Sequence, residues 1–362
     1  MTSGADGIER ELIQQRDFLV VREPAYARLL ELFEEAVRGE LGERLAAVWK
    51  YREFNAWYER PLLLLAALRY EALCERGAHP LNDAVAEMPP RAEAATAEAL
   101  AAAVAPDRAR FFRALGERAV QTNETSRAVT WLWPAHLLAA AGELRPLALV
   151  DLGASAGLNL IADELPEIWS DASGRPIGMM PRPKVEMRLG LDIAPLDVLD
   201  TDQATWLRAC VWPSDGARLS RLEQGISRFR TSAARDDGPR LEVCALPDAP
   251  ARLEALPGDR LVLCMQSIVR DYMSAPDRGR FERGMRDFLL RRPPLSALWS
   301  ELELQTGGAT TEYPAAITVR FVDGAGVARE LVLAHAHPHP NRLRLEPEAI
   351  TAFQAAFQSQ HE

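Results

Sequence analysis

An aspartate followed by a run of very small residues is the feature of this chain best suited to chemistry. Asp151 follows the apolar run Leu147–Val150, and the residues from Gly153 to Gly157 carry almost no side-chain bulk. The apolar run predicts a strand buried on both faces, and the apolar spacing after Gly157 predicts a helix. At such a turn a ligand can approach backbone N–H groups closely. The sequence therefore predicts a ligand site here, with a tight turn that binds nothing as the alternative.

The spacing of the turn bears on which ligand it takes. It reads Asp-x-Gly-x-Ser-x-Gly from Asp151 to Gly157, which differs from the Gly-x-Gly-x-x-Gly of dinucleotide-binding proteins. It resembles the first motif of the class I S-adenosylmethionine (SAM) methyltransferases, an acidic residue followed by Gly-x-Gly-x-Gly. Ser155 departs from that motif, and serine costs backbone freedom if the position needs a positive φ. A carboxylate suits the ammonium group of SAM and suits a pyrophosphate poorly, because like charges would meet.

A second carboxylate, Asp192, ends the next predicted strand, Val185–Asp192. The methyltransferase resemblance implies that this acid hydrogen-bonds the ribose hydroxyls, and a carboxylate accepts from two adjacent hydroxyls at once. The gap from Asp151 to Asp192 is about twice the ~20 residues of a dinucleotide unit. We interpret residues 166–183 as an insertion that accounts for the gap and is a candidate cover for the site. The alternative for Asp192 is a solvated loop aspartate.

Four polar residues in a row, 121–124, lie ahead of the turn, with Arg127 one helical turn later. One interpretation is helix capping, with Glu124 and Arg127 as an i,i+3 pair. The other is that the segment covers the cofactor pocket and contacts the amino-acid end of the cofactor. The predicted cofactor contacts are Gln121, Thr122, Asn123, Arg127, Asp151, Gly153, Ala154, Ser155, Gly157, Asn159 and Asp192.

Candidates for the substrate side follow the strand that begins at Leu261, because ligands of an open α/β sheet lie outside the carboxyl ends of its strands. Gln266 and Asp271 come there, where the resemblance implies substrate-side groups. A loop followed by a helix cap is the alternative. The predicted catalytic residues are these two together with two histidines near the end of the chain, His337 and His339.

Those two histidines belong to an alternating set, His335, His337 and His339. On a strand, alternation would place three imidazoles on one face as metal ligands. Pro338 and Pro340 break the ladder and turn the side chains apart, so we expect no metal. His337 or His339 facing the pocket as a general base is the functional interpretation, and a turn-stabilising role is the alternative.

The chain resembles a bacterial family known only as a domain of unknown function. The similarity lies in Gln-Thr-Asn-Glu with the later Arg127, Asp-Leu-Gly-Ala-Ser-Ala-Gly-Leu-Asn-Leu, Gly-Leu-Asp-Ile-Ala-Pro-Leu-Asp-Val, Val-Trp-Pro and Ala-His-Pro-His. It extends over nearly the whole chain and implies no particular reaction. Gln266 departs from the resemblance, since relatives often have histidine there.

The elements that must position these residues fall into two parts. Residues 8–142 carry helical spacing throughout, including an alanine-rich stretch over 92–104 and a last pair of helices split by Pro134. From Leu147 onward strands and helices alternate, which predicts a parallel sheet with helices on both faces. The last two predicted strands, 317–322 and 330–335, flank the hairpin signal Asp323–Gly326.

We therefore expect an α/β fold in two domains. Residues 1–142 would form an all-helical N-terminal cap domain. Residues 143–362 would form a Rossmann-like, SAM-binding domain, a doubly wound sheet that ends in an antiparallel hairpin and is similar to the class I methyltransferases.

The composition of the chain limits the kinds of molecule that it is expected to bind. The 362 residues are 48% hydrophobic and carry 42 basic against 52 acidic side chains, a formal charge of −10. This balance argues against nucleic acid and anionic membranes as partners. The four cysteines lie far apart without a Cys-x-x-Cys pair, so we expect reduced, buried thiols. With no targeting pattern at the N-terminus, we expect a cytoplasmic protein that acts on a small molecule.

Three functions remain open. The first is a SAM-dependent methyltransferase that acts on a small or medium-sized acceptor, a reaction that needs positioning and sometimes one base. The second is an NAD(P)-dependent oxidoreductase, against which Asp151 ahead of the glycines counts. The third is a non-catalytic cofactor-binding protein with the same fold.

Overall fold

The computed structural model describes residues 4–305 and 310–358. The chain divides into two compact units, unit 1 (Met1–Thr122 and Leu199–Ser220) and unit 2 (Asn123–Val198 and Arg221–Glu362). This division falls 20 residues before the expected domain boundary at 142, and it assigns a later segment of the chain to the helical unit. The chain is a mixed α/β protein with a helical N-terminal region, a nine-stranded sheet and antiparallel strands at its C-terminal side.

Unit 1 consists of helices, as the sequence predicts. The segment that opens at Pro24 is a helix, and the apolar segment around Pro61 is a helix buried over most of its length. The alanine-rich stretch is divided into a 3-10 turn and a short α-helix. The helices of unit 1 are α1 (Gly4–Leu19), α2 (Pro24–Ala36), α3 (Glu40–Val48), α4 (Glu59–Glu75), α5 (Asn82–Val85), η1 (Ala92–Ala94), α6 (Ala97–Ala103), α7 (Ala109–Glu117) and α9 (Thr201–Ala209).

The returning segment Leu199–Ser220 joins unit 1 through α9. The indole of Trp206 packs edge-on against Tyr70 of α4 at 5.6 Å between ring centroids, and it donates to the carbonyl of Ala119 at 2.9 Å. Asp202 accepts from the Tyr70 hydroxyl and pairs with Arg118. Aromatic burial and satisfied polar atoms therefore hold this segment on the N-terminal helices. Helix α10 (Gly216–Ser232) begins in unit 1 and ends in unit 2.

Unit 2 contains one sheet in the order β2-β9-β8-β7-β6-β5-β1-β3-β4. Strands β4, β3, β1, β5 and β6 pair in parallel, and β6, β7, β8 and β9 pair antiparallel. The expected closing hairpin is confirmed as β7 and β8. The strands are β1 (Leu147–Leu152), β2 (Ser170–Asp171), β3 (Val185–Asp192), β4 (Arg240–Val243), β5 (Leu261–Ser267), β6 (Ala297–Leu304), β7 (Ala315–Val322), β8 (Ala328–Ala336) and β9 (Arg342–Leu345).

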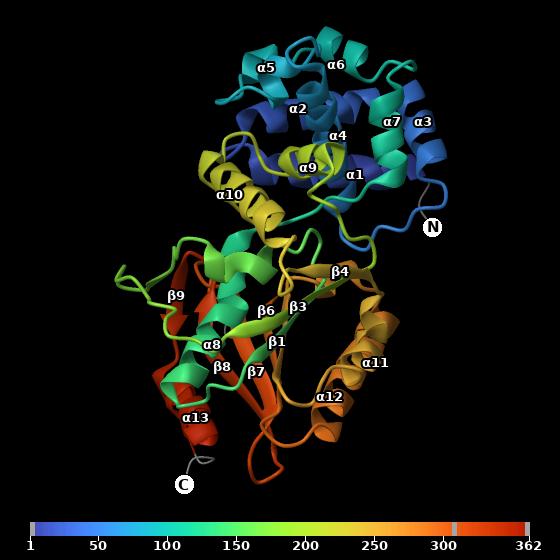
Figure 1. Cartoon of the computed structure of the whole chain (residues 1–362). Coiled ribbons are helices and arrows are strands. Elements are labelled where there is room, and N and C mark those ends of the chain that lie inside the picture. Colours follow the sequence, from blue (N-terminus) through green and yellow to red (C-terminus); the bar gives the residue numbers. More distant parts are fainter. Residues whose placement is uncertain (1–3, 306–309, 359–362) are drawn as a thin grey trace. The chain divides into compact units, whose positions relative to one another are not determined.

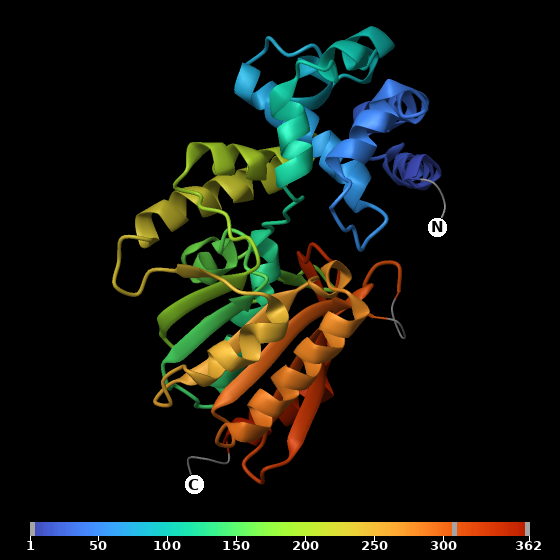
Figure 2. The same cartoon turned by 90° about the vertical axis from the view of Figure 1, so that its right-hand side faces the viewer.

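Helices cover both faces of this sheet because its strands are apolar on both sides (Figures 1 and 2). On one face, residues such as Leu147 and Leu149 join a core with α8 (Val129–Ala140) and α13 (Pro347–Gln358). On the other face, Ala148 and Val150 join a core with α11 (Ala249–Glu254) and α12 (Ala275–Arg291). Successive residues alternate between the two cores, as strand geometry requires.

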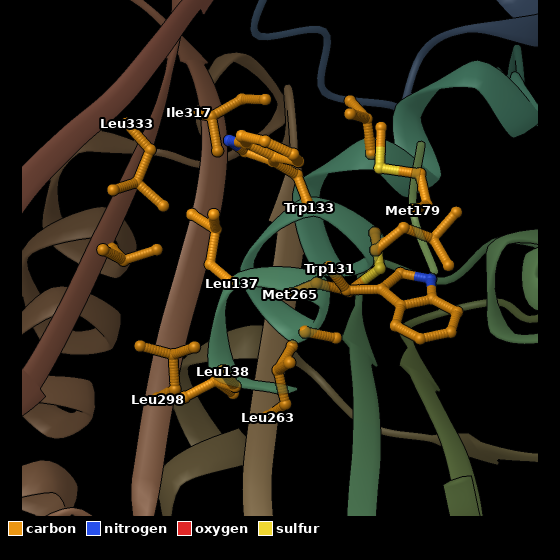
Figure 3. Close-up of a cluster of buried hydrophobic side chains, with 14 of the residues drawn as sticks. Trp131, Trp133, Leu137, Leu138, Met179, Leu263, Met265, Leu298, Ile317 and Leu333 are labelled. Carbon is orange, nitrogen blue, oxygen red and sulfur yellow. The ribbon is translucent and has the colours of Figure 1, made fainter. Parts of the chain in front are cut away.

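Helix α8 is continuous, so the expected split at Pro134 is wrong. Pro134 lies inside the helix and cannot donate to the carbonyl of Thr130, four residues earlier. The hydroxyl of Ser300 on β6 donates to that carbonyl instead. Figure 3 shows Trp131, Leu137 and Leu138 of this helix beside Leu263 and Leu298 of the sheet. Tertiary packing therefore replaces the hydrogen bond that proline removes.

The segment 166–183 is anchored to unit 2 and contributes to its core. Trp169, Ile177 and Met179 are buried in the core around α8, and β2 pairs with β9 at the edge of the sheet. The carbonyl of Pro181 lies 3.0 Å from Nδ1 of His136 on α8. The interpretation of this segment as a cover over the site stays a prediction.

The four cysteines are free thiols, Cys210 and Cys264 buried and Cys74 and Cys244 partly buried. In the described part of the chain, no helix combines the length and the apolar character needed to cross a membrane.

Candidate functional site

The predicted site residues of unit 2 gather at one edge of the sheet because of its topology. The five parallel strands end there, and β8, which runs in the same direction as β6, carries His337 and His339 just beyond the same edge. The chain proceeds from β1 to β3 and β4 on one side and to β5 and β6 on the other. The carboxyl end of β1, from which the strand order runs to β5 on one side and to β3 on the other, is therefore the place where open α/β sheets bind ligands.

The turn after β1 has three residues in the left-handed region. They are Gly153 at φ +85°, Ser155 at φ +51° and Gly157 at φ +70°. The position of Ser155 thus needs the conformation that glycine adopts at lowest cost, and serine is strained there. The hydrogen bond that Asn123 donates to the serine hydroxyl, described below, offsets part of that cost.

The helix expected after Gly157 is not an α-helix, which corrects the sequence prediction. Residues Leu158–Glu164 form the 3-10 segment η3, interrupted by non-helical backbone at Ile161. The apolar residues of this segment are buried, so their spacing reflects packing and not a long amphipathic helix. The turn consequently has no α-helix N-terminus to bind an anion.

The small residues of the turn are required by neighbouring side chains. A Cβ atom on Gly153 would lie 2.5 Å from Cγ1 of Val269, and one on Gly157 would lie 2.7 Å from Cδ2 of Leu241. Val269 follows β5 by two residues and packs against Gly153. This packing is what the alternative of a tight turn predicts.

Asp192 is committed to the same turn. Its Oδ2 accepts from the backbone N–H of Ser155 at 2.8 Å, and its Oδ1 accepts from that of Ala194 at 2.9 Å. Each carboxylate oxygen has a second lone pair, so the group retains capacity for further donors such as ribose hydroxyls. The structure therefore brings Asp192 to the turn, as predicted, in the role of a backbone acceptor.

Asp151 is buried, and it forms no ion pair with any residue that the structure describes. Its residue is only 2% exposed, and its Oδ2 has no hydrogen-bond partner among the described residues. Burial, and then the charge of Asp192, raise the pKa of Asp151 to about 7. The side-chain oxygen of Asn159, another predicted contact, is likewise buried without a donor. A carboxylate in this environment favours a proton or a cationic ligand.

Asn123 holds the turn from the opposite side. Its Nδ2 donates to the hydroxyl of Ser155, and its Oδ1 accepts from the backbone N–H of Ala156 at 3.1 Å. Gln121 and Thr122, also predicted contacts, belong to unit 1, so their contact with a cofactor stays a prediction. One residue of the polar segment thus fixes the shape of the turn directly.

The same segment meets the histidines near the end of the chain. Nε of Arg127 donates to the carbonyl of Pro338 at 2.9 Å. Glu124 has a fully buried side chain, which pairs with Arg221 at 2.9 Å and lies 4.0 Å from Nδ1 of His339. Motif residues more than 200 positions apart therefore form one cluster. Glu124 belongs to this cluster, although the sequence analysis did not predict it as a site residue.

These contacts unite the motifs through which the chain resembles one bacterial family, and a comparison with known families agrees. The family described as "Uncharacterized protein conserved in bacteria (DUF2332)" matches residues 21–344. The chain belongs to this family. A search of curated proteins found no match to the chain.

Gln266 lies on the opposite face of the sheet from Asp151, together with Val262 and Cys264. It has no exposed surface, donates from Nε2 to Glu303 at 2.9 Å, and accepts at Oε1 from the indole of Trp299 at 3.0 Å. Both polar atoms of the Gln266 amide are thus bonded to residues of β6 inside the core, which connects the end of β5 to β6. The geometry of this DUF2332 protein gives no support to the catalytic role predicted for it.

Glu303 was missed by the sequence analysis. It ends the alternation Trp299, Glu301, Glu303, which places two acids on one face of a buried strand and is the signal that could have found it. Its Oε1 accepts from Nε2 of Gln266 and from the backbone N–H of Val269 at 3.1 Å. Burial raises the pKa of Glu303 to about 7.

The segment after β5 is strained. Ile268 adopts φ +50°, which is rare for a β-branched residue, immediately before Val269 covers the glycine turn. Asp271 lies half-buried in the following 3-10 turn η5 (Arg270–Tyr272). The structure places Asp271 at the predicted edge, and its catalytic role stays a prediction.

Of the three histidines that alternate in sequence, His337 and His339 stay together and His335 faces a different residue. Nε2 of His335 faces Glu346 at 3.3 Å, whereas His337 and His339 lie beyond the strand with ring centroids 6.0 Å apart. Among residues 4–305 and 310–358, no three histidine, cysteine or acidic side chains are grouped as metal ligands.

Proposed function

We propose that this DUF2332 protein is a SAM-dependent methyltransferase for a small or medium-sized acceptor, with its cofactor at the carboxyl ends of β1 and β3. The observation that supports the proposal most is the environment of Asp151. A buried carboxylate with an unpartnered oxygen, beside a second carboxylate, creates a negative potential that only a proton or a cation relieves.

The sign of that potential discriminates between cofactors. SAM carries a sulfonium and an amino-acid ammonium, and both would be stabilised near Asp151 and Asp192. The pyrophosphate of NAD(P) would be repelled by the same pair, and η3 provides no α-helix N-terminus to compensate. The geometry therefore favours SAM over a nicotinamide dinucleotide.

The winding of the sheet also supports the proposal. The parallel strands diverge from β1, with helices on both faces, as in the doubly wound folds that bind nucleosides at the divergence. This is fold-level analogy, which carries less weight than the chemistry of the site.

Residues of this chain would hold the cofactor as follows. Asp151 and the side-chain oxygen of Asn159 would face the cationic end, and Asp192 would accept from the ribose hydroxyls. Asn123 would keep the turn in its left-handed conformation through Ser155 and Ala156. When bound, SAM would supply an electrophilic methyl group to the acceptor.

A non-catalytic cofactor-binding protein is the second candidate, and one observation favours it. Val269 packs against Gly153, and Gln266 is sequestered in the core. A protein that binds a cofactor without turnover needs the acid pair and does not need a substrate-side base.

Isothermal titration calorimetry tests the proposal. We expect SAM and its demethylated product to bind the full chain, and NADH to give no heat. Because a cation binds the ionised form of Asp151, binding near pH 7 should release protons, which appear as different heats in buffers of different ionisation enthalpy. The Asp151→Asn variant should lose binding, whereas Asp259→Asn, a change at an exposed aspartate, should not. If neither SAM nor its product gives heat or a thermal shift, the proposal fails.

A further inference from the structure

Four buried side-chain oxygens of unit 2 have no hydrogen-bond partner among the described residues and lie on one side of the sheet. Two belong to the candidate site, Oδ2 of Asp151 and Oδ1 of Asn159. The other two are hydroxyls, Oγ of Ser126 in the 3-10 turn η2 (Thr125–Ala128) and Oγ1 of Thr130 in α8. The exposed fractions of Asp151, Asn159, Ser126 and Thr130 are 2%, 8%, 2% and 0%. Buried polar groups in folded proteins nearly always have a partner, so these four require an explanation.

The register of the sheet places Asp151 at one end of a row that runs toward α8. Side chains alternate along β1, so Asp151 lies on the same face as Leu149, which is the face covered by α8. Asp151 is opposite Met265 of β5, and Met265 is opposite Ser300 of β6. The row from Asp151 to Ser300 therefore spans two strand spacings, about 10 Å.

The segment with the two hydroxyls is fixed over this row. The hydroxyl of Ser300 donates to the carbonyl of Thr130, and the indole of Trp131 donates to the carbonyl of Asn159 at 2.9 Å. Ser126 and Thr130 are four residues apart in the continuous helical segment of η2 and α8, so their side chains lie near one face of it. Both hydroxyls therefore belong to the region between α8 and the face of the sheet on which the aspartate lies.

The four oxygens divide into two chemical kinds. An ionised Asp151 and the amide oxygen of Asn159 only accept hydrogen bonds, whereas each hydroxyl can donate one. The acceptors suit an ammonium group, and the two donors suit a carboxylate. A purely cationic ligand would leave both hydroxyls without an acceptor, and a purely anionic ligand would be repelled by Asp151. An α-amino acid group carries both charges on one carbon and satisfies both pairs.

We infer that Ser126 and Thr130 donate to the carboxylate of an α-amino acid group whose ammonium faces Asp151 and Asn159. The inference rests on the proposed function, and it specifies that the site recognises the complete amino-acid end of the cofactor and not only its positive charge. Neither hydroxyl residue is among the cofactor contacts predicted from the sequence.

A pair of ligands that differ only in the carboxylate tests this inference. Isothermal titration calorimetry of the full chain with SAM and with decarboxylated SAM gives the two affinities. A hydrogen bond to a charged group is worth about ten-fold in affinity, so we expect the wild type to bind SAM at least about ten-fold more tightly. In Thr130→Val and in Ser126→Ala the affinity for SAM should fall by about that factor, while the affinity for decarboxylated SAM should stay the same.

The stability of the ligand-free variants supplies a second readout. A hydroxyl without a protein partner contributes no hydrogen bond to the fold, so Thr130→Val should have an unchanged or higher Tm. The matched control is Thr351→Val on α13, which removes an exposed hydroxyl that donates to the carbonyl of Pro347 at 2.9 Å. This control should keep both affinities of the wild type.

Equal affinities of the wild type for the two ligands would overturn the inference, and so would variants that keep the wild-type preference for SAM. A lower Tm of ligand-free Thr130→Val would also overturn it, because the hydroxyl would then have a partner within the protein. Failure of the proposed function is distinguishable, since neither SAM nor decarboxylated SAM would then bind the wild type.

Discussion

Two buried carboxylates at the same edge of the sheet, Asp151 on β1 and Glu303 on β6, differ in what surrounds them. Burial raises the pKa of each to about 7. Glu303 accepts from Gln266 and from the backbone of Val269, whereas Oδ2 of Asp151 has no partner among the described residues. They lie on opposite faces of the sheet. A similar pKa therefore does not distinguish the two acids, whereas the hydrogen bonding of their side-chain oxygens does.

Removing the satisfied acid should cost the most stability. Glu303→Ala leaves the buried Nε2 of Gln266 and the N–H of Val269 without an acceptor, at about 1–3 kcal/mol each. We expect a loss of about 3–5 kcal/mol in the free energy of unfolding, measured with urea. Glu303→Gln keeps an acceptor oxygen for both donors and should lose much less. Equal losses in the two variants would contradict the hydrogen-bonding role.

Replacing Asp151, whose Oδ2 has no partner among the described residues, should increase the free energy of unfolding at alkaline pH. The pKa of Asp151 rises from its ordinary 3.8 to about 7 on folding. Its stabilising contribution is therefore complete below pH 4 and lost as the pH rises through 7. At pH 8 we expect Asp151→Asn to be more stable than the wild type, by on the order of 3 kcal/mol. Urea unfolding at pH 5 and pH 8 measures this. A variant that is less stable at both values would show that Asp151 has a structural partner.

The contact between Gly153, after β1, and Val269, after β5, should give the next largest effect on stability. Gly153→Ala introduces a Cβ 2.5 Å from Val269 at φ +85°, which should destabilise unit 2 by about 2–3 kcal/mol. Val269→Ala should remove most of the steric part, so the double variant recovers relative to the sum of the single ones. Thermal unfolding of all four proteins completes the cycle.

In addition, Val269→Ala should bind SAM several-fold more tightly, because the side chain that packs against the turn is smaller. Unchanged affinity would argue against a ligand at Gly153.

The smallest effect is expected at Ser155. Replacement by glycine relieves the cost of φ +51° and removes the hydroxyl to which Asn123 donates. Because these terms are of similar size and opposite sign, the free energy of unfolding should change by less than about 0.5 kcal/mol. Chemical denaturation of Ser155→Gly measures the balance, and Ser155→Ala, which keeps the strain and loses the hydroxyl, should be less stable than Ser155→Gly.

Local patterns predict the elements of this protein well where one physical cause decides them. The strand Val185–Asp192 and the hairpin at Asp323–Gly326 lie where apolar runs and turn residues place them. Prediction fails at Pro134, whose lost hydrogen bond is replaced by one from the distant Ser300, and after Gly157, where a 3-10 segment forms in place of the predicted α-helix. The contacts around the turn follow the same division: residue type and spacing predicted that Asp192 and Asn123 belong near it, whereas the buried Glu303 was not predicted.

The sequence by itself determined most of the strands and helices, the acid and small-residue turn after β1, and the family of the chain, because these depend on neighbouring residues and on composition. Only the tertiary structure decided that Glu124 lies beside His339, that Val269 packs against Gly153, and that Oδ2 of Asp151 has no partner among the described residues while Oε1 of Glu303 accepts two hydrogen bonds. Those outcomes depend on which strand ends share an edge and on which face each side chain points. Spacing along the chain carries no information about either until the strand order is set.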